Sequence, residues 1–210
     1  MNQLDIDILR ARLSETLPGT EAHSLMMPSH RKLVSADSLL EGSFKPGAVL
    51  VLLCYDKSKR YFIPLIQRFS YEGHHSGQVA LPGGKPESGD ADLQETALRE
   101  CFEEIGLGHD VEVLGGLSPL YISVSGFLVH PFVAVYKKEV ESFVPHEREV
   151  EEVLKFFLDE LLDEKNKQIG EVQLPGGHLE APYFALSDKR VWGATAMILS
   201  EFREVLRSIS

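Results

Sequence analysis

The sequence predicts a domain of the α/β (α+β) class, and three observations support that prediction. Residues 48–55, AVLVLLCY, form a continuous apolar run that is typical of a central β-strand. A helix with one apolar face is expected to end at Gly106, and a second amphipathic helix should end near Leu206. Strand patterns lie before and after the first of these helices. This order of elements predicts a β-sheet with helices packed on it.

Composition limits the class of protein. The chain has 210 residues, of which 43% are hydrophobic, so it can bury one sizeable core. Its formal charge of −11 argues against nucleic acids and membrane surfaces as partners. The N-terminus has no basic segment of a signal peptide, and no apolar run approaches the roughly 20 residues of a membrane span. Cys54 and Cys101 show no disulfide pattern, so we expect reduced thiols in a soluble, cytoplasmic protein.

Two parts are expected along the chain: an N-terminal helix and wrapping arm at residues 1–44, and a main domain at residues 45–210. Apolar residues spaced through residues 4–17 predict an amphipathic helix that ends at the following Pro-Gly pair. This helix should pack on the main domain or on a second subunit, so a homodimer is one expected assembly. Residues 22–32 are expected to form a loop.

Further strands are predicted around the central run. Residues 61–68 should form the second strand, with Pro64 at an edge or irregularity. Residues 111–120 predict a strand and a turn, and residues 121–136 predict one or two more strands. Residues 143–157 are expected to form an acidic loop that enters another strand.

Residues 81–107, LPGGKPESGDADLQETALRECFEEIGL, carry the strongest functional pattern. A Pro-Gly-Gly turn precedes a helix whose spacing places Glu100, Glu103 and Glu104 on one face. Three neighbouring carboxylates repel each other unless a cation lies among them, and Mg²⁺ and Mn²⁺ prefer oxygen ligands. We therefore expect a divalent metal site here. A solvated acidic face is the alternative.

The same stretch resembles the signature of the Nudix hydrolases. Residues 99–107, RECFEEIGL, match every fixed position of its second half, R-E-U-x-E-E-x-G-U, where U is a bulky apolar residue. The first half departs from the signature: Asp90, not Glu, lies six residues after Gly84, and eight residues rather than seven separate it from Arg99. Glu87 and Asp90 are both candidates for the first-half acid.

This resemblance implies the Nudix fold, a mixed β-sheet sandwiched between α-helices. It also implies that Glu100, Glu103 and Glu104 hold Mg²⁺ or Mn²⁺. The backbone carbonyl of Gly84 resembles a further ligand position. The resemblance also implies that Glu103 and Arg99 are catalytic residues. Arg99 should orient a signature glutamate through a bidentate pair.

A motif upstream resembles the coenzyme A pyrophosphatase branch of the Nudix family, L-L-T-x-R-S-x3-R-x3-G-x3-F-P-G-G. The matching positions imply substrate contacts at Arg68, Gly77 and Gly83. Gly73 replaces an arginine of the motif, and His74 or His75 could substitute for it. Residues 124–133, VSGFLVHPFV, resemble a second piece of the same branch, with Gly in place of its usual Asn.

In Nudix enzymes a later acid often completes the metal site or acts as general base. Glu149 and Glu152 are the candidates here, with Glu147 behind them, and a solvated loop is the alternative for each.

The resemblance implies metal-dependent hydrolysis of the pyrophosphate bond of coenzyme A or its thioesters, which gives 3′,5′-ADP and (acyl-)4′-phosphopantetheine. A small-molecule nucleoside diphosphate derivative is thus the expected partner. The alternatives are a Nudix pyrophosphatase acting on NADH or ADP-ribose, and a ligand-sensing Nudix domain without catalysis. Sensing domains usually lose signature glutamates, and this chain retains all three.

A second Pro-Gly-Gly turn occurs late in the chain. Residues 174–180, LPGGHLE, echo residues 81–87, LPGGKPE. No acidic helix pattern follows this second turn, so we expect a hairpin rather than a second site.

Overall fold

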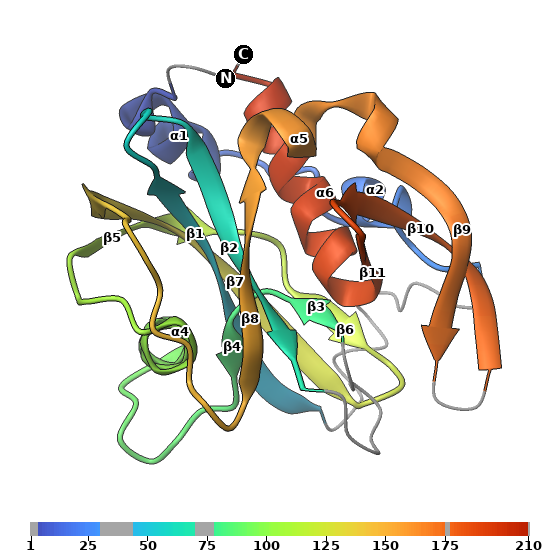
Figure 1. Cartoon of the computed structure of the whole chain (residues 1–210), viewed down its shortest axis with the longest axis horizontal. Coiled ribbons are helices and arrows are strands. Elements are labelled where there is room, and N and C mark those ends of the chain that lie inside the picture. The colour runs from blue at the N-terminus through green and yellow to red at the C-terminus, as the bar shows by residue number, and fades with distance from the viewer. Residues whose placement is uncertain (1–3, 30–43, 70–77, 175–176, 210) are drawn as a thin grey trace.

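A mixed β-sheet with helices on both faces forms the centre of the protein (Figure 1). The structure, a computed structural model, describes residues 4–29, 44–69, 78–174 and 177–209. The described strands of this sheet are β1 (Lys45–Tyr55), β2 (Tyr61–Arg68), β3 (Val79–Ala80), β4 (Gly83–Gly84), β5 (Val111–Gly116), β6 (Leu120–Ile122), β7 (Phe127–Glu139) and β8 (Val150–Phe157). β1 and β7 run parallel, whereas the other strand pairs are antiparallel. The predicted mixed sheet between helices is confirmed.

β1 lies at the centre because both of its faces are apolar. Leu50 and Leu52 belong to the core on one side of the sheet, and Val51 and Leu53 belong to the core on the other side. Successive side chains of a strand point to opposite faces, so a continuous apolar run suits a strand that is covered twice.

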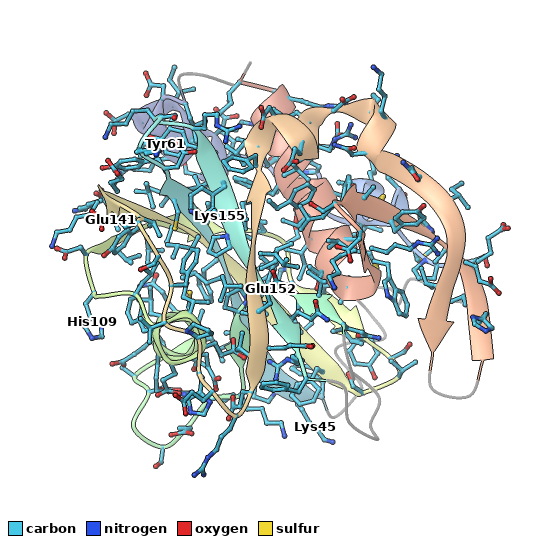
Figure 2. All side chains as sticks on the ribbon, viewed as in Figure 1. Lys45, Tyr61, His109, Glu141, Glu152 and Lys155 are labelled. Carbon is cyan, nitrogen blue, oxygen red and sulfur yellow. The ribbon has the colours of Figure 1, made fainter. Side chains whose placement is uncertain are left out.

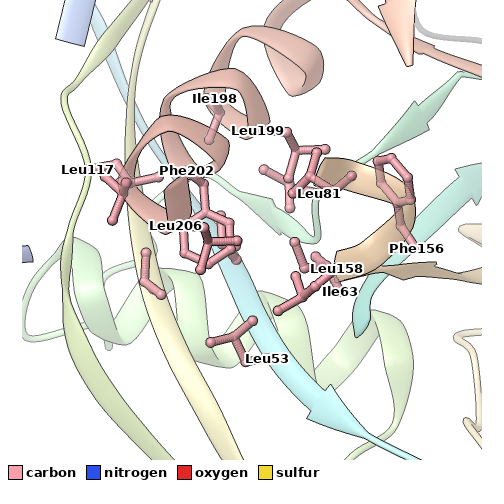
Figure 3. Close-up of a cluster of buried hydrophobic side chains, with 14 of the residues drawn as sticks. Leu53, Ile63, Leu81, Leu117, Phe156, Leu158, Ile198, Leu199, Phe202 and Leu206 are labelled. Carbon is pink, nitrogen blue, oxygen red and sulfur yellow. The ribbon is translucent and has the colours of Figure 1, made fainter. Parts of the chain in front are cut away.

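The described helices divide between the two faces. They are α1 (Ile6–Leu13), α2 (Gly19–Ser24), α4 (Leu93–Ile105), α5 (Leu158–Leu162) and α6 (Gly193–Arg207). α4 covers one face alone, and α6 lies on the other face near α1 and α2 (Figure 1). Figure 3 shows part of the core under α6, where Phe202 and Leu206 lie opposite Leu53 and Ile63. Full burial of each such side chain contributes about 1.5–3 kcal/mol.

α4 has the limits expected from its sequence. The Asp92 side chain caps its N-terminus by accepting a hydrogen bond from the Glu95 amide at 2.8 Å. Gly106 ends it in the left-handed conformation, with φ of 67°, which costs glycine little. Cys101 and Ile105 are fully buried against the sheet, so the helix presents its acids from a fixed base.

β2 separates from β1 soon after their hairpin turn. The two strands pair at Tyr61 and Phe62, and β4 then takes the place of β2 beside β1, at Ala48 and Val49. Pro64 lies beyond the last β1–β2 pair and pairs with β8 instead, which confirms the predicted irregularity. This exchange of strands brings the Gly-Gly pair into the sheet.

A second, antiparallel sheet follows the first. It consists of β9 (Lys167–Leu174), β10 (Gly177–Leu186) and β11 (Lys189–Trp192), preceded by the short helix η1 (Glu164–Asn166). Gly177 pairs with Leu174, so the predicted hairpin at residues 174–180 is confirmed.

The N-terminal segment differs from the sequence prediction in two ways. α1 ends at Leu13 rather than extending to residue 17, and the loop predicted from residue 22 begins only at Leu25 because α2 extends to Ser24. Contacts from outside the segment stabilise α2: the Gly19 amide donates to Glu201 of α6 at 2.9 Å. Leu13 packs in the same core as α6, which is one of the two expected placements of the first helix. Across the described ranges, every helix is too short or too polar to cross a bilayer.

Candidate active site

The Gly-Gly pair of β4 lies in direct contact with the acidic face of α4. A β-carbon on Gly84 would lie 2.3 Å from Oε1 of Glu100, and one on Gly83 would lie 2.2 Å from the carbonyl oxygen of Ala48. Gly83 also has φ of 152°, which side chains with a β-carbon rarely adopt. Glycines at both positions therefore let the glutamates of the helix approach the sheet.

Glu104 is the most buried acid of this helix face. Only 1% of the residue is exposed, and its carboxylate accepts hydrogen bonds from Arg68 Nη2 and from the Gly83 amide, both at 2.8 Å. Burial, helped by the charges of Glu100 and Glu149, raises the pKa of Glu104 to about 7 against the opposing effects of Arg68 and the Gly83 hydrogen bond. Arg68, expected to contact substrate, is thus already paired with an acid of the site.

Arg99 joins the loop before α4 to the helix acids. Its Nε and Nη2 atoms donate to the two oxygens of Asp90 at 2.9 and 3.0 Å, and Nη2 also donates to the Lys85 carbonyl at 3.1 Å. Hydrogen bonds from Arg99, and then from the Glu87 amide, hold the pKa of Asp90 well below its usual range. The predicted bidentate pair is therefore made with Asp90 and not with a signature glutamate.

Of the two candidates for the first-half acid, Asp90 is the one whose side chain is buried and paired with Arg99. The Asp90 side chain is 4% exposed, whereas that of Glu87 is 70% exposed and lies 3.9 Å from Arg99. Sequence reasoning missed Thr96, which is fully buried and donates to Asp90 at 2.9 Å. A polar residue among the inward-facing positions of an amphipathic helix was the available signal.

Glu100 and Glu103 both contact the same guanidinium nitrogen of Arg99. Arg99 Nη1 is 3.2 Å from Oε1 of Glu100 and 3.3 Å from Oε2 of Glu103. Burial raises the pKa of Glu100, Arg99 opposes this, and the charges of Glu103 and Glu149 raise it further. The Glu103 side chain is 57% exposed, so it lies where the site meets solvent.

The loop before β8 docks on the end of α4. The Val144 and His146 amides donate to the carbonyls of Ile105 and Glu104, both at 3.1 Å. Residues 144–149 and Glu103 line an open pocket of about 540 Å³. Glu147 and Glu149 thus lie beside the helix acids, and the negative charge of Glu149 raises the pKa of both Glu100 and Glu104.

Glu152 is not brought to this cluster. It lies on β8 (Figure 2), where Leu154 and Phe156 pack into the core beneath α6. Alternation along the strand places Glu152 on that same face, away from α4. Gly77, together with Gly73, His74 and His75, lies outside the described residues.

The donor chemistry of the site fits a divalent cation. Among the described residues, no three His, Cys, Asp or Glu side chains surround one point closely enough to hold a metal, and both oxygens of Glu104 already accept hydrogen bonds. Glu100 nevertheless contacts Gly84, and the charges of Glu103 and Glu149 raise the pKa of Glu100 while those of Glu100 and Glu149 raise that of Glu104. A divalent ion with a preference for oxygen ligands would relieve this repulsion.

Known proteins resemble this chain in sequence and in fold. The NUDIX domain model matches residues 44–175. The human mitochondrial coenzyme A diphosphatase NUDT8 is 34% identical over 171 residues, which cover 80% of this chain and 72% of that protein. The Nudix hydrolase NudL of Pectobacterium atrosepticum is 37% identical over 168 residues, which cover 75% of this chain and 80% of that protein. The crystal structure of RenU, a Nudix hydrolase from M. smegmatis, shares the fold, with a TM-score of 0.52 at 19% identity over 88% of this chain and 95% of that chain.

Proposed function

The chain belongs to the Nudix hydrolase family, and on this premise we propose that it cleaves the pyrophosphate bond of coenzyme A or its thioesters. The products would be 3′,5′-ADP and (acyl-)4′-phosphopantetheine. Family membership itself establishes a pyrophosphatase that acts on phosphoanhydrides, and Nudix enzymes generally use divalent metal ions. The proposal adds the substrate and the roles of individual residues.

The similarity to coenzyme A diphosphatases is the observation that carries the choice of substrate. The human and mouse proteins of that name are 34% and 36% identical to this chain. Two short motifs, one upstream of the acidic helix and one in β7, point to the same branch. These matches favour coenzyme A over NADH and ADP-ribose.

We assign the metal to Glu100, Glu103 and Glu104, with the Gly84 carbonyl beside them. Mg²⁺ or Mn²⁺ bound there would lower the pKa of an attacking water and neutralise charge on the diphosphate oxygens. The fold holds these carboxylates in position. Gly84 allows Glu100 to approach the sheet, and Arg68 and the Gly83 amide hold Glu104. Acids that cannot move away from each other retain their repulsion until a cation binds.

Glu149 is the residue that we assign to proton transfer from the water. It lies in the loop that docks on α4 and lines the pocket together with Glu103. A general base must reach the proton that it removes, and the solvent-facing side of the acidic cluster satisfies that requirement. Arg99 is a positioning residue in this scheme, because it contacts Asp90, Glu100 and Glu103.

Chromatographic product analysis tests the proposal. Purified protein with Mg²⁺ or Mn²⁺ is incubated separately with coenzyme A, acetyl-coenzyme A, NADH and ADP-ribose. The proposal predicts fast release of 3′,5′-ADP from the two coenzyme A substrates and slow cleavage of the others. Preferential cleavage of NADH or ADP-ribose would overturn the substrate and leave the family chemistry in place. No cleavage of any of the four would overturn the coenzyme A proposal and point to a different phosphoanhydride substrate.

A further inference from the structure

Two lysines and one aromatic ring lie together beside the acidic cluster, at the strand ends where β1, β4 and β7 meet. Lys45 begins β1 (Figure 2), Lys85 follows β4, and Phe127 begins β7. The ammonium nitrogens of the two lysines lie 5.8 and 5.6 Å from the centroid of the Phe127 ring. These distances are within the range of cation–π attraction, so the ring holds both charges near one place.

The ring is close to the backbone of the proposed metal site. A β-carbon on Gly47 would lie 3.3 Å from the Phe127 ring and 3.4 Å from the Gly84 carbonyl oxygen. The ring and the Gly84 carbonyl therefore both lie next to the position that a Gly47 side chain would occupy. Glu100 contacts Gly84 in turn, so the lysines and the acids approach the same short segment of β4.

Both lysine charges are available to a ligand. Within the described ranges neither Lys45 nor Lys85 forms an ion pair, and both residues are exposed. The two arginines of the site differ, since Arg68 is paired with Glu104 and Arg99 with Asp90. A polyanionic substrate entering a chain of net charge −11 needs unpaired local cations, and these lysines supply them.

We propose that Lys45 and Lys85, held over Phe127, bind a phosphate group of the nucleoside diphosphate substrate beside Gly84. This inference rests on the proposed function for the location of the diphosphate. The ligand is a phosphate oxyanion, either of the diphosphate itself or of the 3′-phosphate that coenzyme A also carries. An ammonium group contacts phosphate as a point charge, so the pair sets affinity more than orientation.

Steady-state kinetics of Lys45→Gln, Lys85→Gln and the double variant test this inference. Each single change is expected to raise KM about tenfold with little change in kcat, because a charge-assisted contact is lost. Lys85→Arg should restore most of the loss, and the double variant should show a weaker salt dependence of kcat/KM. Lys57→Gln is the matched control, since Lys57 is an exposed lysine in the turn between β1 and β2.

Coenzyme A and dephospho-coenzyme A, which lacks the 3′-phosphate, identify the phosphate. A rise in KM for coenzyme A alone assigns the lysines to the 3′-phosphate, and an equal rise for both assigns them to the diphosphate. A KM for both substrates that matches the Lys57→Gln control would overturn the inference. If the wild-type protein instead cleaves ADP-ribose or NADH, the proposed function fails, and the KM for that substrate then decides the role of the lysines.

Discussion

Two glutamates, Glu104 of α4 and Glu201 of α6, are buried to the same extent on opposite faces of the sheet. Their exposed fractions are 1% and 0%. Glu201 receives hydrogen bonds from the Gly19 and Ser118 amides at 2.9 and 3.0 Å, and its carboxylate lies 3.0 Å from His23 Nε2. Burial alone would raise its pKa, but these hydrogen bonds outweigh burial and hold the pKa below its ordinary value.

Glu104 also accepts hydrogen bonds, but its pKa is raised rather than lowered. Arg68 and the Gly83 amide oppose burial, but the neighbouring charges of Glu100 and Glu149 help to keep its pKa at about 7. The comparison shows that a buried acid is not in itself a sign of function. Glu201 has enough donors to fix α2 and the β5–β6 connection in place, whereas the cluster around Glu104 retains an excess of negative charge that a cation can neutralise.

The largest effect on the catalytic side should come from Glu103→Gln. This change removes a proposed metal ligand that is largely exposed, so kcat should fall by at least about 10³-fold while the fold stays intact. Turnover and the thermal unfolding midpoint are the two measurements. Glu95→Gln, an exposed residue of the same helix, is the control. Turnover of Glu103→Gln at the wild-type rate with Mg²⁺ present would refute the site.

A smaller effect is expected from Gly84→Ala. The new methyl group would collide with the Glu100 carboxylate and displace it, so kcat should fall about 100-fold. Gly89→Ala is a matched control because a β-carbon there has nothing within 4 Å. Equal kcat values for the two variants would show that the position of Glu100 does not matter.

On the other face, Glu201→Ala should affect stability and not chemistry. It leaves the Gly19 and Ser118 amides and His23 without their acceptor, so the free energy of unfolding should fall by roughly 3 kcal/mol. Urea unfolding measures this loss, and kcat per folded molecule should stay unchanged. A large loss of kcat in folded protein would mean that α6 takes part in catalysis.

The smallest effect concerns the pH dependence of stability. The pKa of Glu201 is lowered from 4.5, so its contribution is complete above that pH and disappears as the pH falls through the lower, folded-state pKa. The stability difference between wild type and Glu201→Gln should therefore be constant above pH 4.5 and shrink as the pH falls below that value. Urea midpoints measured above and below pH 4.5 would contradict the assignment if the difference stayed constant throughout.

Local patterns in the sequence predicted much of the fold. β2 has the predicted limits, and α4 ends at Gly106 as expected, because a continuous apolar run and a left-handed glycine cap are signals that neighbouring residues carry. α2 could not be predicted in this way. It consists of six residues, and its Gly19 amide bonds to Glu201, which is 182 residues away in the sequence.

In the candidate site too, local patterns were predictable from the sequence and distant contacts were not. Helical spacing predicted that the three glutamates share a face, but the partner of Arg68 lies 36 residues away and required the structure. The choice between Glu87 and Asp90 depended on how the loop folds back on Arg99. The place of Glu152 on the far face was predictable, since strand alternation with Leu154 and Phe156 was visible in the sequence.

Direct metal binding tests the central claim, that the excess negative charge on the α4 face exists to hold a divalent ion. Calorimetric titration of Mn²⁺ into metal-free wild type, Glu100→Gln and Glu95→Gln needs no substrate and no turnover. We predict binding to wild type and to Glu95→Gln with equal affinity, and a dissociation constant at least about tenfold higher for Glu100→Gln. Equal affinity in all three proteins would contradict the claim.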